Sequence, residues 1–178
     1  MTAAAELIGE VGWGRVTTRA VAERAGLPHG AVSYHFRGKQ DLLIEASMSA
    51  FANAMPYAEF ATPSTMDELL TLVGAEIGAG VAGNRALTRL MFESLREAER
   101  DEKLRARLGE MLATYRQVIV DLVRTTQADG AMPAQVSPEG VATLLGAVGD
   151  GLLLHALLDP DLDVAGALET LRALLARR

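Results

Sequence analysis

Residues 17–39, with the sequence TTRAVAERAGLPHGAVSYHFRGK, carry the clearest structural pattern in this chain. Thr17 or Thr18 can cap a helix, because a hydroxyl oxygen can accept an N–H group of the first turn. Gly26 follows the expected end of that helix, where a left-handed backbone is common. Pro28 suits the first turn of the next helix, where its missing N–H group costs no hydrogen bond. The pattern predicts two short helices joined by a tight turn.

The two helices have distinct apolar and polar sides. The apolar positions are expected to share one small core, formed by Val21, Leu27, Val32 and Phe36. The second helix leaves polar or small residues on its outer side, namely His29, Gly30, Ser33 and Tyr34. Lys39 then begins a third helix, where a cation is unfavourable unless an anion such as a phosphate lies beside it. A helix-turn-helix of this kind places its second helix in the major groove of DNA.

Over about residues 3–48 the segment resembles the DNA-binding domain of the TetR family of bacterial transcription regulators. The matching residues are Gly12, Thr17, Thr18, Ala22, Ala25, Gly26, Gly30, Tyr34, His35, Phe36, Lys39, Leu42 and Leu43. The resemblance implies that the two short helices contact DNA and that the lysine binds a phosphate. Carried over to this chain, the implied DNA contacts are Thr18, Arg19, His29, Gly30, Ser33, Tyr34, His35 and Lys39.

The charge of the chain is uneven. The 178 residues have a net charge of −6, yet residues 1–46 carry five basic and five acidic side chains, so the whole excess is in the remainder. The acidic remainder of the chain repels the phosphate backbone of DNA. We therefore expect weak nonspecific affinity for DNA, and binding by two copies of residues 1–46, called the head from here on, acting together. The absence of cysteine excludes disulfides and cysteine-ligated zinc, and no export signal opens the chain. We expect a cytoplasmic bacterial protein.

The remainder of the chain shows no strand-like alternation and predicts an all-α fold. The expected helices, about nine in number, cover 2–12, 18–25, 29–35, 39–54, 65–82, 84–98, 101–128, 138–158 and 164–177. We expect two domains. Residues 1–46 would form the three-helix DNA-binding domain, and residues 47–178 a helical domain for ligand binding and dimerisation.

The segment 140–158 is almost wholly apolar, with Asp150 and His155 as its strongly polar residues. A membrane span is not expected, because a central aspartate costs about 2.5–3.5 kcal/mol there and no basic flank is present. A helix that is apolar all round must be buried on all sides, which favours a homodimer. The resemblance implies that the last two helices form a four-helix bundle with their copies. The predicted interface is Leu144, Leu145, Val148, Gly149, Leu152, Leu153, Leu157, Leu168, Leu171 and Leu175.

Apolar and aromatic residues at helical spacing in the body have two interpretations. They are either ordinary core or the lining of a cavity for an apolar ligand, since methionine suits adaptable pockets. Asp150 and His155 could orient a ligand or bond across the dimer interface. The candidate ligand-binding residues are Phe60, Met66, Leu87, Met91, Phe92, Leu95, Met111, Tyr115, Asp150 and His155.

No residue pattern indicates catalysis, a metal site or a cofactor. The sequence therefore predicts a dimeric, ligand-responsive repressor rather than an enzyme. It would bind double-stranded DNA at a palindromic operator and be released by a small, largely apolar effector. The main alternative is a helical ligand-binding or interaction module that has lost specific DNA binding. The neutral charge of residues 1–46, the absence of a basic N-terminal arm, and Ser33, at a position that is often aromatic in the family, favour this alternative. A helical-bundle enzyme is a third interpretation.

Overall fold

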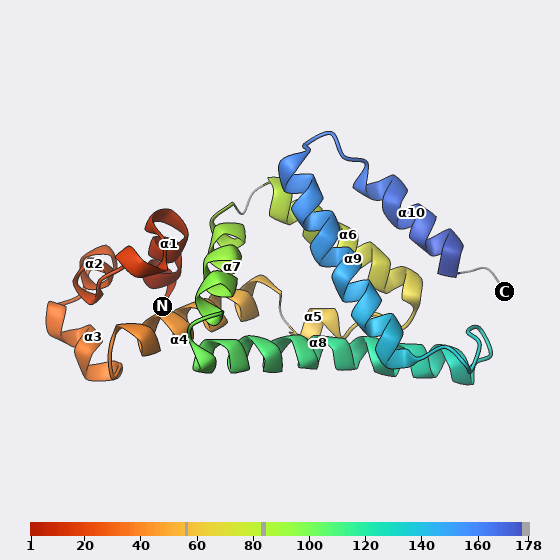
Figure 1. The fold of residues 1–178 in the computed structure, drawn as a ribbon, viewed down its shortest axis with the longest axis horizontal. Coiled ribbons are helices and arrows are strands. Elements are labelled where there is room, and N and C mark those ends of the chain that lie inside the picture. The colour runs from red at the N-terminus through yellow and green to blue at the C-terminus, as the bar shows by residue number, and fades with distance from the viewer. Residues whose placement is uncertain (56, 83–84, 176–178) are drawn as a thin grey trace. The chain divides into compact units, whose positions relative to one another are not determined.

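All regular secondary structure in the described part of the chain is helical, as predicted (Figure 1). The computed structural model describes residues 1–55, 57–82 and 85–175, with no description of the side chains of residues 29, 33, 79–82 and 85. These residues form ten α-helices and one 3₁₀ turn, η1. The elements are α1 (Thr2–Val11), η1 (Trp13–Arg15), α2 (Thr18–Arg24), α3 (His29–His35), α4 (Lys39–Ala54), α5 (Tyr57–Phe60), α6 (Met66–Ala82), α7 (Arg85–Ala98), α8 (Glu102–Ala128), α9 (Pro138–Leu158) and α10 (Val164–Leu175).

The helices agree closely with those expected from the sequence, and the difference is one extra helix. α5 is a single turn of four residues, too short to show a helical period in the sequence. It is held by packing rather than by propensity. The ring of Phe60 meets that of Tyr115 edge-on at 5.0 Å between centroids, and Tyr57 lies 6.3 Å from the same ring.

Two compact units divide the chain, and each has its own core. The first unit comprises residues 1–55 and 85–110. In it, α1 packs against both α4 and α7. α1 and α7 approach closely at Gly9, where an added Cβ would lie 2.8 Å from the carbonyl oxygen of Ala86. The core side chains include Ile8, Trp13 and Leu43, each almost completely buried.

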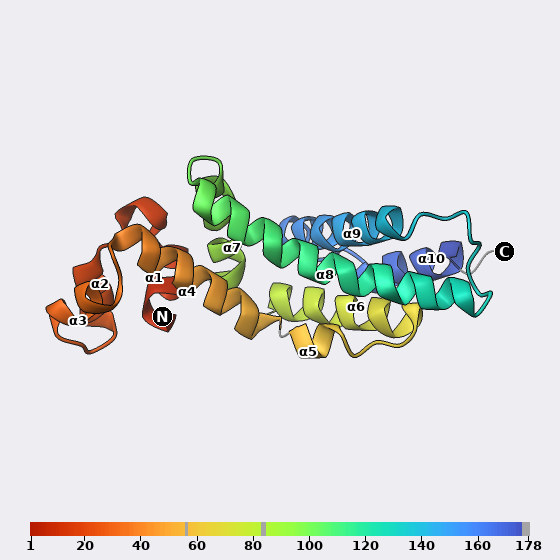
Figure 2. The same cartoon turned by 90° about the horizontal axis from the view of Figure 1, so that it is seen from below.

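The second unit comprises residues 57–82 and 111–175. Its core joins α6, the later part of α8, α9 and α10 through a cluster that includes Leu69, Val123 and Leu145. α8 is therefore a continuous helix that begins in the first unit and continues into the second (Figure 2). The expected domain boundary at residue 46 lies inside α4.

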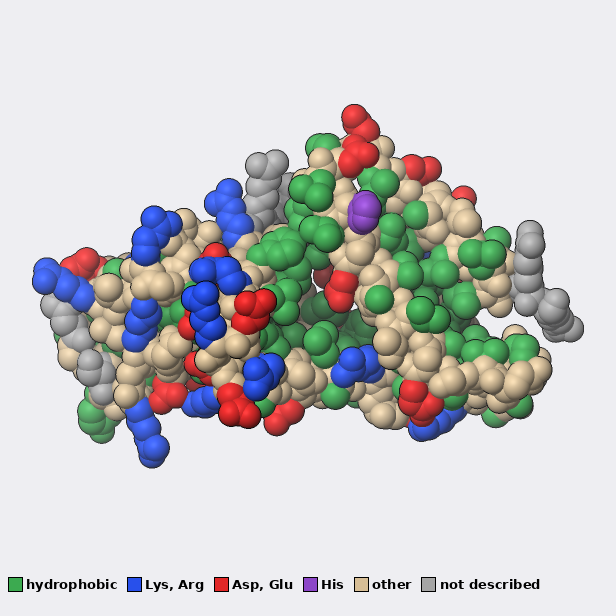
Figure 3. Space-filling view, viewed as in Figure 1, with side chains coloured by type: hydrophobic (Ala, Val, Ile, Leu, Met, Phe, Trp, Pro, Cys, Tyr) green, Lys and Arg blue, Asp and Glu red, His purple; other side chains and the backbone are tan. Residues whose placement is uncertain are grey.

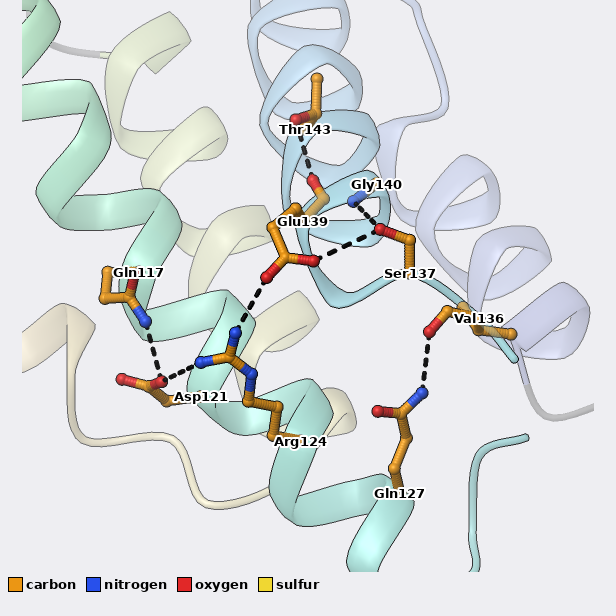
Figure 4. Close-up of polar contacts among 9 residues, drawn as sticks. All are labelled: Gln117, Asp121, Arg124, Gln127, Val136, Ser137, Glu139, Gly140 and Thr143. Carbon is orange, nitrogen blue, oxygen red and sulfur yellow. Dashed lines mark hydrogen bonds and ion pairs between the residues drawn. The ribbon is translucent and has the colours of Figure 1, made fainter. Parts of the chain in front are cut away.

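The connection between α8 and α9 is fixed by side chains (Figure 4). Ser137 caps α9 by accepting a hydrogen bond from the N–H group of Gly140 at 3.1 Å. Arg124 donates to Glu139 at 2.9 Å, and the amide of Gln127 donates to the carbonyl oxygen of Val136 at 2.8 Å. These bonds join the last turns of α8 to the start of α9.

Candidate nucleic-acid interface

The turn between α2 and α3 has well-defined hydrogen bonds. Thr17 caps α2, because its hydroxyl accepts the N–H group of Ala20 at 3.1 Å. At the other end Gly26 has a φ of 67°, in the left-handed region. Its N–H group donates to the carbonyl of Glu23, and that of Leu27 to the carbonyl of Ala22. This pair of bonds is a Schellman motif, which ends α2 and directs the chain into α3.

One expectation for this turn is wrong. The sequence predicts Leu27 in the core, yet 51% of its surface is exposed. The Schellman bonds hold its backbone at the outside of the turn, and the space between the two helices is filled by Val21, Ala22 and Val32, all buried.

α3 presents an open outer surface. Tyr34 is 86% exposed, and its ring meets that of His35 edge-on at 5.1 Å. Gly30, in the first turn, has nothing within 4 Å of the position where a Cβ would be, so its backbone is open to a close approach. The side chains of His29 and Ser33 lie outside the described part of the structure. The described residues of α3 therefore offer an aromatic ring, an imidazole and exposed backbone to a partner.

The two arginines of α2 are both paired with carboxylates, but with different geometry. Arg19 lies 3.0 Å from Glu23, one turn along α2. Arg24 donates to both oxygens of Glu10, at 3.0 and 2.8 Å, and this bond lowers the pKa of Glu10. Thr18, another predicted contact, is half-buried at the start of α2.

Lys39 stands at the first position of α4, as predicted, but its ammonium group is engaged within the head. Nζ donates to the carbonyl oxygen of Gly14 at 2.8 Å. An ammonium has three N–H groups, so two remain for another acceptor such as a phosphate oxygen. The sequence could not show this bond, because the two residues lie 25 positions apart.

A network of hydrogen bonds holds the start of α4 against η1 and α7. The buried indole of Trp13 donates to Gln40 Oε1 at 2.7 Å, and the Gln40 amide donates in turn to Glu97 at 3.1 Å. Glu93 accepts the backbone N–H of Trp13 at 2.9 Å. Its hydrogen bonds with Arg96 and with the Trp13 backbone lower the pKa of Glu93. These residues lie in α4, α7 and the η1 turn, and they fix the end of the head that adjoins α3.

Arg37 is a basic residue of this surface that was not among the predicted DNA contacts. It lies between Phe36, which ends α3, and Gly38, which precedes α4, and it is exposed. Its place in the Arg-Gly-Lys segment between two predicted helices was the available signal.

The ten candidate ligand-binding residues do not come together in one unit. Leu87, Met91, Phe92 and Leu95 are on α7 in the first unit, and the other six are in the second. Phe60 is buried in the core of the second unit, and Met66 and Tyr115 pack against that core. Burial raises the pKa of Tyr115, and partial loss of water raises that of Asp150.

Neither of two grooves among the described residues matches the candidate set. A half-open groove of about 410 Å³ lies between α6, the end of α9 and α10, and none of the ten residues lines it. A second groove, of about 310 Å³, lies among α1, α4 and α7, and includes Leu87 alone of the ten. Neither groove therefore brings the candidate residues together, and their role in ligand binding stays a prediction.

The predicted dimer residues are placed on two different faces. Leu145 and Leu168 are buried in the core of their own unit, which contradicts their assignment to a subunit interface. Leu152, Leu171 and Leu175 pack against that core, and Gly149 faces Val73 of α6. Val148, Leu153 and Leu157 are half-buried, whereas Leu144 is 67% exposed. Leu154, Leu158 and Leu174, which were not predicted, are also exposed.

α9 remains an apolar helix with an uncovered side. By length and composition alone it could cross a membrane, with a mean hydropathy of 1.8 over its most apolar window, of which 11% is buried. Such a single helix is weak evidence for a span, because helices at the cores of water-soluble proteins have the same composition. Hydrophobic side chains are visible over α9 and α10 on the face shown in Figure 3.

Comparisons with known proteins agree on one family. Residues 1–46 match the model of bacterial regulatory proteins of the tetR family, and residues 67–178 match that of the BetI-type transcriptional repressor C-terminal domain. An HTH-type transcriptional regulator of Mycobacterium tuberculosis is 23% identical over 171 residues, covering 92% of this chain and 84% of that protein.

Solved structures show the same fold. A transcriptional regulator from Streptomyces coelicolor has a TM-score of 0.76 and 26% identity, covering 99% of this chain and 95% of that one. A regulator from Saccharomonospora viridis, in complex with choline, has a TM-score of 0.75 and 24% identity over 97% and 91% of the two chains. FadR from Bacillus subtilis, in complex with stearoyl-CoA, has a TM-score of 0.76 and 20% identity over 98% and 94%.

Proposed function

The chain belongs to the TetR family of bacterial transcription regulators, and on this basis we propose that it is a homodimeric repressor. It binds a palindromic operator through α3 and is released by a small, largely apolar effector. The main support for DNA binding is the outer surface of α3. Tyr34, His35 and Gly30 are exposed there, beside a turn that is fixed by hydrogen bonds.

In the proposed complex α3 lies in the major groove. The residues that contact DNA are Thr18, Arg19, His29, Gly30, Ser33, Tyr34, His35 and Lys39. A two-fold dimer places two copies of α3 about one helical turn of DNA apart, roughly 34–36 Å or a multiple of it. A palindromic operator follows from that symmetry.

The dimer forms through the outward sides of α9 and α10. Leu144, Leu154 and Leu158 lie on the side of α9 that is turned away from the core of its unit, and Leu174 is the exposed leucine of α10. These four large apolar side chains lie on two helices that both pack on α6, and together they offer an apolar surface that a partner can cover. A second copy of the same surface supplies this cover, as in the isologous contacts of two-fold dimers.

The proposed response to an effector passes through α8. This helix is covalently continuous from the second unit into the first, where its first two turns are bonded to α4. Lys103 lies 2.6 Å from Asp41, and Arg107 lies 2.8 Å from Glu45. The two acids are one turn apart on α4 and the two bases are one turn apart on α8, so the pairs resist sliding of one helix along the other. An effector that binds the released state more tightly than the DNA-binding state lowers the affinity for DNA. The size of the effect is set by the ratio of the effector's affinities for the two states.

A titration with labelled duplexes tests DNA binding. The dimer is titrated against palindromes selected from random sequence, and anisotropy is followed at 50 and 200 mM salt. Tyr34→Ala should weaken operator binding about 10- to 100-fold. Tyr57→Ala is the matched control, because it removes an exposed tyrosine from the second unit and should leave binding unchanged. If the wild type binds operator and random duplex equally at low salt, the proposed function is wrong. The alternative of a helical module without specific DNA binding would then be favoured.

Choline and stearoyl-CoA are suitable first probes for the effector, because they are bound in structures of two similar proteins. A largely apolar effector site predicts that an acyl-CoA, rather than choline, releases the operator. Release is measured as loss of anisotropy of the bound duplex at fixed protein concentration. Release by choline alone would contradict the proposed apolar character of the effector.

A further inference from the structure

The basic side chains of the DNA-binding head are mostly occupied by bonds within the protein. Residues 1–46 contain five of them, and four have a partner. The engaged bases are Arg15, which donates to the carbonyl of Val11, Arg19 with Glu23, Arg24 with Glu10, and Lys39 with the carbonyl of Gly14. Arg19 and Arg24 must give up or share a carboxylate before they can neutralise a phosphate. Arg15 and Lys39 bond to neutral carbonyl oxygens and keep their charge, but one N–H group of each is already occupied.

Arg37 is the exception. It is exposed and has no hydrogen bond or ion pair with any residue that the structure describes. The nearest acid along the chain after it is Asp41, whose carboxylate lies 2.6 Å from Lys103. The positive charge of Arg37 is therefore not compensated locally.

The position of Arg37 places this charge beside the proposed DNA surface. It directly follows Phe36 at the end of α3 and is two residues before the start of α4. Gly38, the N-cap of α4, has no side chain to accept the first N–H groups of that helix. A free guanidinium next to the end of the recognition helix can bind phosphate oxygens with two parallel hydrogen bonds.

We propose that Arg37 is a phosphate-binding side chain of the head. The inference rests on the proposed DNA binding and adds a residue to it. Phosphate contacts hold a protein on any duplex, whereas base contacts select a sequence. Arg37 therefore contributes equally to operator and random DNA.

The salt dependence of binding measures this contribution directly. Each neutralised phosphate contributes about 0.9 to the slope of log affinity against log salt. A dimer has two copies of Arg37, so Arg37→Ala should reduce the slope by about 1.8. Between 50 and 200 mM salt, the affinity ratio of wild type to variant should then fall by about 12-fold. Arg37→Lys, which keeps the charge, should retain most of the slope.

Arg116→Ala is the matched control. Arg116 is an exposed arginine of α8 in the second unit, and no bond or ion pair is found for it among the described residues. Its removal changes the net charge by the same amount without touching the head, and the slope should stay at the wild-type value. Circular dichroism of each variant verifies that the helices are intact.

The outcomes separate this inference from the function on which it rests. If the wild type binds its operator and Arg37→Ala has an unchanged slope, Arg37 is not a phosphate contact, and DNA binding stands. An equal loss of slope in Arg116→Ala would also overturn the inference, because the effect would then be one of net charge. If the wild type shows no specific binding at 50 mM salt, the proposed function itself fails.

Discussion

Replacing Gly9 by alanine tests a close contact between two helices of the first unit, α1 and α7. Alanine usually stabilises a helix relative to glycine, by about 0.5–1 kcal/mol, because glycine loses more backbone freedom on folding. At this site the new Cβ would lie 2.8 Å from the carbonyl oxygen of Ala86, whereas ordinary contacts begin near 3.4 Å. The obstacle is backbone, so α1 and α7 must move apart by several tenths of an ångström.

The free-energy cost of this movement can be measured separately by replacing a second glycine with alanine. Gly109 is a helical glycine of the same unit, in α8, and a Cβ there would meet nothing within 4 Å. Gly109→Ala should therefore show the helix gain alone. Forced overpacking costs about 1–3 kcal/mol, so the two variants should differ by about that amount. For a chain of this size each kcal/mol shifts the melting temperature by about 2–4 °C.

Thermal and urea unfolding followed by circular dichroism at 222 nm measures both variants. Protein concentration is held constant, because dimerisation would make the melting temperature depend on it. Gly9→Ala should melt below the wild type or close to it, and Gly109→Ala above it. Equal stabilisation by the two substitutions would show that α1 and α7 do not approach at Gly9 as described.

Three further predictions concern other parts of the molecule. Glu93→Gln should destabilise the first unit. Because folding lowers the pKa of Glu93, its stabilising effect is complete above its ordinary pKa near 4.5 and is lost as the pH falls through the folded value; the difference from wild type in urea unfolding should therefore shrink with acid. Leu158→Glu should shift the dimer towards monomer in sedimentation equilibrium, and the exposed Leu27→Glu should not. Lys103→Glu should reduce effector-driven release of the operator in the anisotropy assay, and Asp41→Lys in the same chain should restore it; a full response in the single variant would exclude this ion pair from the coupling.

Local features of the fold were predictable from sequence because they depend on neighbouring residues. Thr17 caps α2 and Gly26 takes the left-handed turn as expected, since both effects act within a few residues. The 138–158 helix has the predicted ends, with Pro138 in its first turn. The family resemblance of residues 1–46 is confirmed by the family match.

Features that depend on distant partners were not predictable. α9 is apolar all round, so periodicity could not distinguish the buried Leu145 from the exposed Leu144 beside it. The candidate ligand residues of α7 lie in the first unit because α7 packs on α1, a contact between residues far apart in the chain. The partners of Lys39 and Arg24 are also non-local. Arg37 is distinguished from them only when those partners are known.

The buried Trp13 gives this molecule an optical reporter of its own. It is the single tryptophan in the chain, and its indole N–H bonds to Gln40, the residue after Lys39 at the start of α4. Displacement of α4 would break that bond and admit water, which shifts indole emission to longer wavelength. Stopped-flow mixing with an inducer could therefore time the movement of the head without any label.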